Sequence, residues 1–465
     1  MNAGFKLIAP EHVPALDDAF RPAVLANRNF VLELDREGVG VPLVLGLQRM
    51  DGEISRFETQ VYPEGHLRFD SALAYVERNL KFLLWQKGGW KIFVGGPKGI
   101  GEYLRECYSP NGVRSFDYHF MGEDVYEKTF TVVPCDPTDV PAESERGTPL
   151  GGHLEGYRIG FDLGASDRKA AAVVDGQAIF SEEVFWQPKV QVDPEYHYRE
   201  VMSALKKAAE KMPRVDAIGG SAAGIYIDNR VRIASLFRGI PKERYDEVRG
   251  LFLRIQDEMA VPLQVANDGD VTALAGSMSL EDVGVLGIAM GSSEAGGYVD
   301  MEGNITGWLN ELAFAPVDYN PQAPVDEWSR DRGVGAQYFS QECVFRLASK
   351  VGIELPSEIP KAAQLELVQE KLEAGERPAE MIWQTIGCYL GYALAHYADF
   401  YDLKHVIILG RCTSGRGGRL ILDGATEVIE NEFPAIAAQV RIQLPDEGSR
   451  RVGQAVAAAS LPALG

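Results

Sequence analysis

The chain has 465 residues, 46% of them hydrophobic, and a formal net charge of −21 at pH 7. This length and composition are typical of a globular protein with two or three domains. The negative charge would repel a phosphate backbone or an anionic membrane surface. We therefore expect neither nucleic acid nor a membrane among its partners.

The cysteines are scattered and odd in number, and none forms a CxxC pair. This pattern argues against a disulfide framework and against a cysteine-rich zinc site, and it favours a reducing compartment. No apolar run approaches the roughly 18 residues that a membrane span requires, and no signal peptide is apparent. We expect a cytoplasmic protein.

The first 135 residues predict a small α/β unit. "FVLELD" predicts a strand ending at Asp35, and two further strands turn at Asp51-Gly52. A helix is expected over "ALAYVERNLKFLLWQ", followed by a strand into Gly95-Gly96. The Pro- and Gly-rich residues that follow have no apolar period, so we predict a linker over residues 136–156.

The same order of elements follows the linker. A strand ends at Asp162, two more strands turn at Asp175-Gly176, and a helix precedes a strand into Gly219-Gly220. The equal spacing favours an internal duplication, although two unrelated units of similar size would give the same lengths. Because Asp35 is followed by Arg-Glu instead of Leu-Gly, we expect the first copy to be degenerate and to bind no nucleotide.

Three glycine-containing turns follow predicted strands in the C-terminal part. They are "FDLGAS" from Phe161, "GSS" from Gly291, and Gly410-Arg411 after "HVIIL". Small residues at such turns let backbone N–H groups reach a phosphate, and an aspartate beside them can orient Mg²⁺. Each turn taken alone is equally compatible with an ordinary hairpin or loop.

"VANDGDVTALAG" places Asn267 and Asp268 where a buried strand meets a helix that we expect to start at Val271. A carboxylate there can accept a proton from an alcohol during phosphoryl transfer. Alternatively, these side chains only cap the helix, because Asn and Asp are preferred N-caps. Asp270 fits the capping role better than Asp268 does.

The order of these motifs from Tyr157 to about Gly465 resembles the ROK family of sugar kinases and regulators. The resemblance implies an α/β, actin-like (ribonuclease H-like) fold with two lobes. We accordingly expect a degenerate N-terminal domain over residues 1–135, a first lobe over 157–275 and a second lobe over 276–465. The N-terminal copy is expected to pack against this unit or to mediate association into a homo-oligomer.

The resemblance also implies roles for individual residues. Asp268 would be the catalytic base that takes the proton of the attacking sugar hydroxyl, and Asp162 would orient Mg²⁺. The other expected residues divide into those that bind the sugar, Gly220, Ser221, Gly224, Asn267, Asn310 and Glu311, and those that bind ATP, Asp162, Gly164, Ser166, Gly291, Ser292, Ser293, Gly410 and Arg411.

Three positions depart from the family pattern. Phe314 stands where the family has a zinc- and sugar-binding histidine, and the cysteine-rich element expected after it keeps only Cys343. No zinc is therefore expected, and the far wall of the sugar pocket is assigned to Asp326, Glu327, Trp328 or Gln337. Glu294 follows the second phosphate turn and must turn away, bind Mg²⁺ or indicate lost nucleotide affinity, because a nearby carboxylate repels phosphate.

Two functions follow from the resemblance. The first is an ATP- and Mg²⁺-dependent kinase acting on a sugar or polyol, and the second is a catalytically weak sugar- or nucleotide-binding regulator. ROK repressors carry an N-terminal helix-turn-helix, whereas residues 1–150 here read as β-rich and acidic, which disfavours a DNA-binding version. Phosphoryl transfer to a non-sugar acid and ATP hydrolysis are further alternatives.

Overall fold

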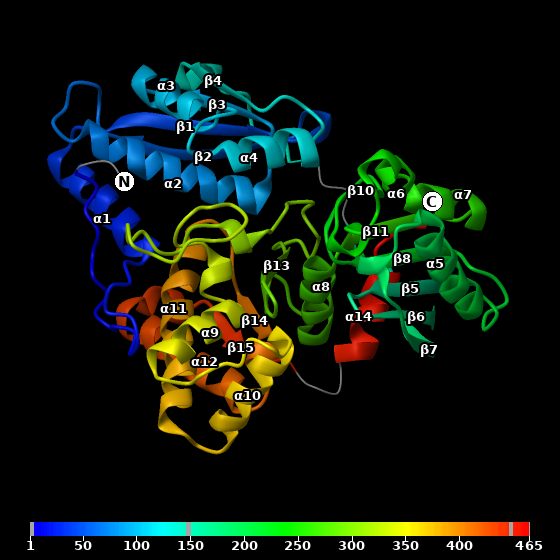
Figure 1. Cartoon of the computed structure of the whole chain (residues 1–465). Coiled ribbons are helices and arrows are strands. Elements are labelled where there is room, and N and C mark those ends of the chain that lie inside the picture. Colours follow the sequence, from blue (N-terminus) through cyan, green and yellow to red (C-terminus); the bar gives the residue numbers. More distant parts are fainter. Residues whose placement is uncertain (1–3, 146–149, 446–449, 465) are drawn as a thin grey trace.

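The computed structural model describes residues 4–145, 150–445 and 450–464. It has three parts: an N-terminal unit, a first lobe and a second lobe, and the N-terminal unit lies across the second lobe (Figure 1). Within the described residues, no helix combines the length and the apolar character needed to cross a membrane. The expected mixed α/β, two-lobed fold is confirmed.

The N-terminal unit begins with a helix where we predicted a strand. Residues Ala23–Glu37 form α1, so the predicted strand ending at Asp35 is wrong. Phe30 and Leu34 are buried one helical turn apart, which is a helical period. The remaining elements are β1 (Val41–Gln48), β2 (Ile54–Val61), α2 (Phe69–Lys87), β3 (Lys91–Gly95), α3 (Lys98–Cys107), α4 (Ser115–His119) and β4 (Thr131–Cys135).

The first lobe contains the predicted three-stranded meander. Its elements are β5 (Tyr157–Leu163), β6 (Asp167–Val174), β7 (Gln177–Phe185), α5 (Pro194–Ala209), β8 (Ala217–Ala222), β9 (Ile225–Ile227), β10 (Arg230–Ile233), α6 (Tyr245–Arg249), α7 (Leu251–Met259) and β11 (Leu263–Asn267). The five-stranded sheet has the order β11-β8-β5-β6-β7, with β5, β8 and β11 parallel.

The N-terminal sheet repeats this order without one strand. Its order is β2-β1-β3-β4, which matches β7-β6-β8-β11 of the first lobe if β5 is left out. The helix α1 takes the place of that strand in the chain, and β3 pairs directly with β1. The N-terminal unit therefore has no counterpart of β5 or of the turn that follows it.

The second lobe contains α8 (Asp268–Leu280), β12 (Val285–Met290), β13 (Glu294–Val299), α9 (Gln341–Lys350), α10 (Lys361–Glu373), α11 (Arg377–Tyr397), β14 (His405–Leu409), α12 (Arg416–Glu432), α13 (Pro434–Ala437) and β15 (Arg441–Gln443). Its sheet has the order β13-β12-β14-β15.

The last helix, α14 (Arg450–Ala459), returns to the first lobe, although we assigned residues 276–465 to the second. It packs so closely on β5 and β8 that a Cβ at Gly160 would lie 1.9 Å from the carbonyl oxygen of Ala455, and one at Gly219 would lie 1.6 Å from that of Ala458. Only glycine fits at these two crossings.

One hydrophobic core spans the N-terminal unit and the second lobe, whereas the first lobe has its own core. Residues from α1 and α2 pack in this shared core with residues from α9 and α11. The N-terminal unit is therefore fixed to the second lobe, as expected for a copy that packs against the kinase-like unit. The linker contributes to the contact, because Ser144 pairs with Ile54 at the edge of β2. Residues 146–149 of the predicted linker lie outside the described residues.

Candidate functional site

The junction of β11 and α8 is capped by Asn267. Its Oδ1 accepts a hydrogen bond from Gly269 N at 2.7 Å, and α8 begins at Asp268, three residues earlier than we predicted. The cap assigned to Asp270 is therefore wrong. The amide nitrogen of Asn267 donates to the carbonyl oxygen of Gly224 at 2.7 Å, so both ends of this side chain are engaged within the protein.

Asp268 occupies the first position of α8. Gly269 N donates to its Oδ1 at 3.1 Å. Burial, together with the negative charge of Asp162, raises the pKa of Asp268 to about 6. A carboxylate with a pKa just below neutral pH is ionised in the cell and still basic enough to accept a proton.

Two further carboxyl groups lie near Asp268. Asp270 accepts hydrogen bonds from Tyr298 N at 3.2 Å and from the amide nitrogen of Asn310 at 3.0 Å. Burial raises the pKa of Asp270 and that of Glu311 to about 7, and in both cases the charge of Asp268 adds to the shift. Asp268 has the lowest pKa of the three, so it is the first to ionise as the pH rises.

Asn310, which we expected to bind sugar, is buried, and its side chain is already occupied. It donates to Asp270, and its oxygen accepts from the hydroxyl of Tyr401 at 3.0 Å. The backbone N–H groups of Asn310 and Glu311 donate to the carbonyls of Gln86 and Trp85 at the end of α2. The N-terminal unit therefore holds the segment that carries Glu311.

The first of the three glycine-containing turns joins β5 to β6. Ser221 donates to Asp162 Oδ1 at 2.7 Å, and Lys169 Nζ lies 3.6 Å from Asp162 Oδ2. Burial raises the pKa of Asp162. Lys169 was missed in the sequence, although it stands directly opposite Asp162 in the β5–β6 hairpin and a hairpin register would have indicated it.

The other predicted residues of this lobe have local partners. Gly164 N donates to Asp167 O at 2.9 Å, while Ser166 is exposed and donates to the carboxylate of Asp167 at 3.0 Å. A Cβ at Gly220 would lie 2.1 Å from the ring of Phe161, so this glycine is required for packing. Gly224 has a φ of +131° and binds Asn267 through its carbonyl.

The second glycine-containing turn leaves Ser292 and Ser293 exposed between β12 and β13, and Glu294 points into the core. Tyr397 donates to Glu294 Oε1 at 3.3 Å, and the side chain is 3% exposed. Burial raises the pKa of Glu294 to about 8, so it is uncharged at neutral pH. Of the three explanations for this residue, the structure supports the one in which its side chain turns away from the glycine-containing turn.

The third turn lies beside the second. A Cβ at Gly410, whose φ is +100°, would lie 2.5 Å from the carbonyl oxygen of Met290, immediately before Gly291. Arg411 is exposed at the start of the following turn, and its carbonyl accepts from Gln369 at 2.7 Å. The structure thus brings together two turns that are about 120 residues apart in the chain.

Phe314 packs into an aromatic cluster of the N-terminal unit. Its ring centroid lies 4.4 Å from that of Trp85 and 5.6 Å from that of Phe116. The segment after it is held by Asp331, which pairs with Arg114 at 2.7 Å and with Arg78 at 3.1 Å. Buried aromatic contacts and ion pairs with the N-terminal unit thus fix the region where the family resemblance placed a zinc site.

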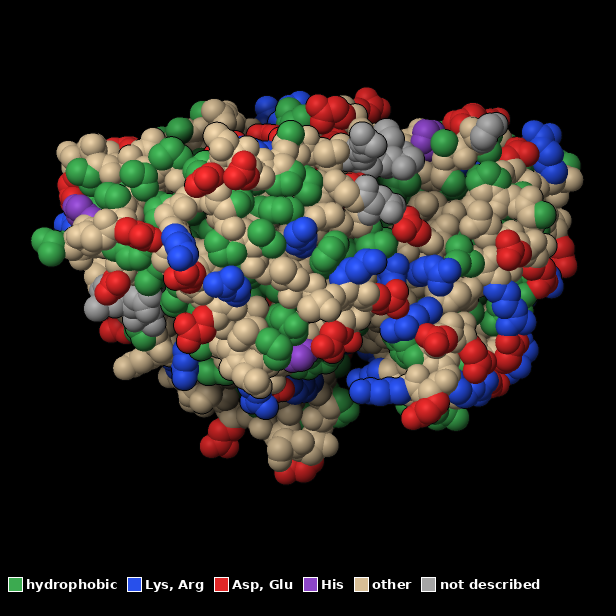
Figure 2. Space-filling view, turned by 90° about the horizontal axis from the view of Figure 1, so that it is seen from above, with side chains coloured by type: hydrophobic (Ala, Val, Ile, Leu, Met, Phe, Trp, Pro, Cys, Tyr) green, Lys and Arg blue, Asp and Glu red, His purple; other side chains and the backbone are tan. Residues whose placement is uncertain are grey.

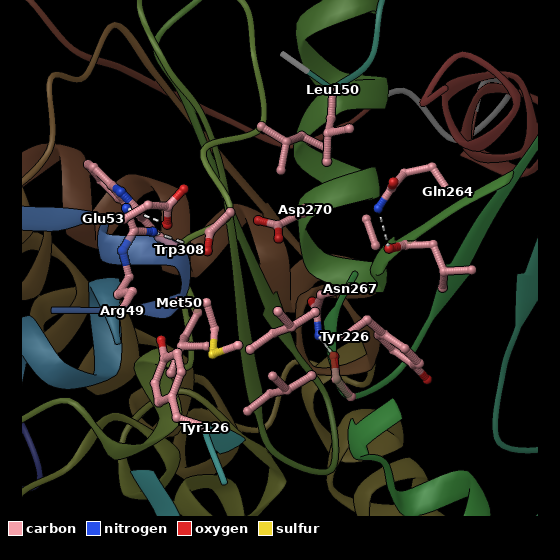
Figure 3. Close-up of a pocket in the computed structure, with 18 residues that line it drawn as sticks. Arg49, Met50, Glu53, Tyr126, Leu150, Tyr226, Gln264, Asn267, Asp270 and Trp308 are labelled. Carbon is pink, nitrogen blue, oxygen red and sulfur yellow. Dashed lines mark hydrogen bonds and ion pairs between the residues drawn. The ribbon is translucent and has the colours of Figure 1, made fainter. Parts of the chain in front are cut away.

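A cavity of about 100 Å³ lies between the three parts (Figure 3). Gly224, Asn267 and Asp270 line one side, and Arg49, Met50, Glu53 and Tyr126 of the N-terminal unit lie across from Tyr226, Asn267 and Gln264. None of the four residues that we assigned to the far wall of a sugar pocket, Asp326, Glu327, Trp328 and Gln337, lines this cavity. Asp326 instead accepts from Ser329 N at 2.7 Å, and the side chain of Trp328 is exposed.

Among the described residues, no group of three or more His, Cys, Asp or Glu side chains is placed to hold a metal ion. All five cysteines are free.

Two comparisons with known sequences are negative. No family model matches the chain, and no curated protein is significantly similar to it.

Comparison with solved structures identifies the fold. A ROK hexokinase from Thermus thermophilus matches with a TM-score of 0.50 and 18% identity, covering 65% of this chain and 98% of that one. A ROK-family transcriptional regulator, described as a homologue of the E. coli MLC protein, matches with a TM-score of 0.50 and 16% identity, covering 64% of this chain and 77% of that one. The expected likeness to ROK proteins is thus confirmed for the fold.

Proposed function

We propose that the protein is a ROK-type kinase that transfers a phosphoryl group from ATP to a hydroxyl of a sugar or polyol. The observation that carries this proposal is the position of Asp268, a half-buried carboxylate at the start of α8 whose pKa of about 6 suits a general base. Asp162 at the first phosphate turn is close enough to influence that pKa. A cytoplasmic location is part of the proposal.

In the proposed reaction, Asp268 accepts the proton of the attacking hydroxyl as the new oxygen–phosphorus bond forms. Asp270 and Glu311 are about half protonated near neutral pH, since burial raises the pKa of each to about 7. In that state they can donate hydrogen bonds to other hydroxyls of the acceptor. Positioning and charge stabilisation supply most of the rate enhancement in such transfers.

The residues near Asp162 fit a polyphosphate. Asp162 would orient hydrated Mg²⁺, the ammonium of Lys169 would offset phosphate charge, and the exposed turns at Ser166 and Ser292-Ser293 offer backbone donors. Bound MgATP would supply the phosphoryl group together with the cation that neutralises it. The inward turn of Glu294 removes the one carboxylate that would oppose phosphate binding at the second turn.

A panel of sugars and polyols assayed for ADP release tests this function. We expect turnover with at least one acceptor in the wild type and a loss of about a thousandfold or more in Asp268→Asn, because the amide cannot accept the proton. Asp246→Asn, at an exposed position in the first lobe, is the matched control and should retain full activity. Unchanged turnover in Asp268→Asn would refute the role of the base.

A second candidate is a sugar-binding regulator without turnover. The observation that favours it is the likeness of the fold to that of a ROK-family transcriptional regulator. Sugar binding in calorimetry, combined with no ADP release for any acceptor, would select this function over the kinase.

A further inference from the structure

The cavity between the three parts is lined by the N-terminal unit as well as by the two lobes. This unit contributes Arg49 and Met50 at the end of β1, Glu53 before β2, and Tyr126 after α4 (Figure 3). The N-terminal unit is fixed to the second lobe by a shared core. Its residues therefore form a permanent wall of this cavity.

Two ion pairs connect this wall to the first lobe. Glu127, next to Tyr126, pairs with Arg232 at 2.5 Å and with Arg249 at 3.1 Å. Lys and Arg side chains gather near this boundary in the view from above (Figure 2). Because the wall contacts both lobes, an acceptor in the cavity is enclosed on the side opposite Asn267.

The Nε–H group of Arg49 has no hydrogen-bond partner among the described residues. Its guanidinium pairs with Glu145 and with Glu53 at 3.4 Å, and it donates to the carbonyl oxygen of Gly307 at 3.3 Å. The side chain is 3% exposed. A buried donor without a partner is costly, so a ligand oxygen in the cavity would satisfy it.

The charges of the lining disfavour an anionic acceptor. Arg49 is its one cation among the described residues, and Glu53 and Glu145 already balance that charge. Asp270 lines the same cavity, and Asp268 lies nearby. A phosphate or carboxylate on the acceptor would meet negative charge without a free cation to offset it.

From these observations we propose that the N-terminal unit forms one wall of the acceptor site and that Arg49 donates through Nε to a hydroxyl oxygen of a small, neutral polyol. This inference rests on the proposed function, because it takes the cavity to be the site where the acceptor binds. A volume of about 100 Å³ is below the range of roughly 300–1,000 Å³ for sites that hold drug-sized ligands, so the acceptor is a single small polyol.

Two variants test the wall. In Arg49→Lys the charge that balances Glu53 is kept but the planar guanidinium is lost, and we expect the KM for the acceptor to rise about tenfold or more with the KM for ATP unchanged. Met50→Ala enlarges the cavity, and we expect kcat/KM to improve for acceptors with one added methyl group. The matched controls are Arg36→Lys and Leu67→Ala, at exposed positions of the same unit.

The acceptors to compare are glucose and mannitol, which are neutral, and gluconate and glucose 6-phosphate, which are anionic. We expect measurable turnover only with neutral compounds. Preference for an anionic compound, or unchanged acceptor kinetics in both Arg49→Lys and Met50→Ala, would overturn the inference.

If no compound is phosphorylated, the proposed function fails, and the wall is then tested by binding. Trp308 lines the cavity and reports on it by fluorescence, with Trp308→Phe as the control. Weaker binding of glucose or mannitol in Arg49→Lys than in the wild type would support the wall. Equal binding, or no binding of either compound to the wild type, would overturn it.

Discussion

Replacing Glu294 by glutamine should stabilise the protein at neutral pH and leave its stability at low pH unchanged. Glu294 is buried, and its Oε2 has no hydrogen-bond partner among the described residues. Burial raises its pKa from 4.5 to about 8. Glutamine has nearly the same shape as the protonated side chain and can keep the contact with Tyr397.

The sign and size of this stability change follow from proton linkage. Below pH 4.5 the Glu294 side chain is protonated in the folded and unfolded states, so its titration does not change the free energy of unfolding. As the pH rises from 4.5 to 8, the unfolded chain ionises while the folded protein holds its proton, and the wild type loses about 1.4 kcal/mol per pH unit. At pH 7 the accumulated loss is about 3 kcal/mol, which Glu294→Gln removes. Above pH 8 the difference stays constant.

The assay is urea unfolding of the wild type and of Glu294→Gln at pH 4.5 and pH 7. Glu302→Gln, at an exposed turn after β13, is the matched control and should show the same stability as the wild type at both values. A gain for Glu294→Gln that is equal at both pH values would refute the argument, because it would be independent of the proton. Unchanged KM for ATP at pH 7 is also expected, since Glu294 is already uncharged there.

Three further predictions concern other parts of the molecule. The kcat/KM of the wild type should fall about tenfold per pH unit below about pH 6 as Asp268 becomes protonated, and a pH-independent rate between pH 4.5 and 7 would contradict this role. Asp331→Asn leaves three buried cations, Arg78, Lys81 and Arg114, with only Glu77 and Asp117 to balance them, and it should cost about 3–5 kcal/mol in urea unfolding. Asp399→Asn, in an exposed pair, should cost at most about 1 kcal/mol, and equal losses would exclude the buried network as the cause. Glu127→Gln should raise the KM for the acceptor several-fold and change the stability by less than about 1 kcal/mol. High salt should raise the same KM in the wild type, because it screens these ion pairs. A salt-independent KM would show that the ion pairs of Glu127 do not hold the wall.

The periodicity of the sequence was sufficient to predict most of the elements. In the meander of β5, β6 and β7, each strand either contains an apolar run or alternates between more and less buried residues. The turns between these strands contain Gly or Asp-Gly. Residues 30–35 were mistaken for a strand because a short apolar run fits both structures, and only the longer pattern from Ala23 shows a helical period. The start of α8 was missed because Asn267 and Asp270 are equally suitable caps in sequence.

The sequence by itself determined most of the strands, their turns, and the place of Asp268 directly after a strand, because these depend on neighbours within about ten residues. Only the tertiary structure decided the direction of Glu294 and the assignment of the pocket wall to Arg49. Each depends on contacts between residues roughly 100 or more positions apart, such as Glu294 with Tyr397 and Arg49 with Glu145 and Gly307. Burial and partner choice are set by packing, which the local sequence pattern does not specify.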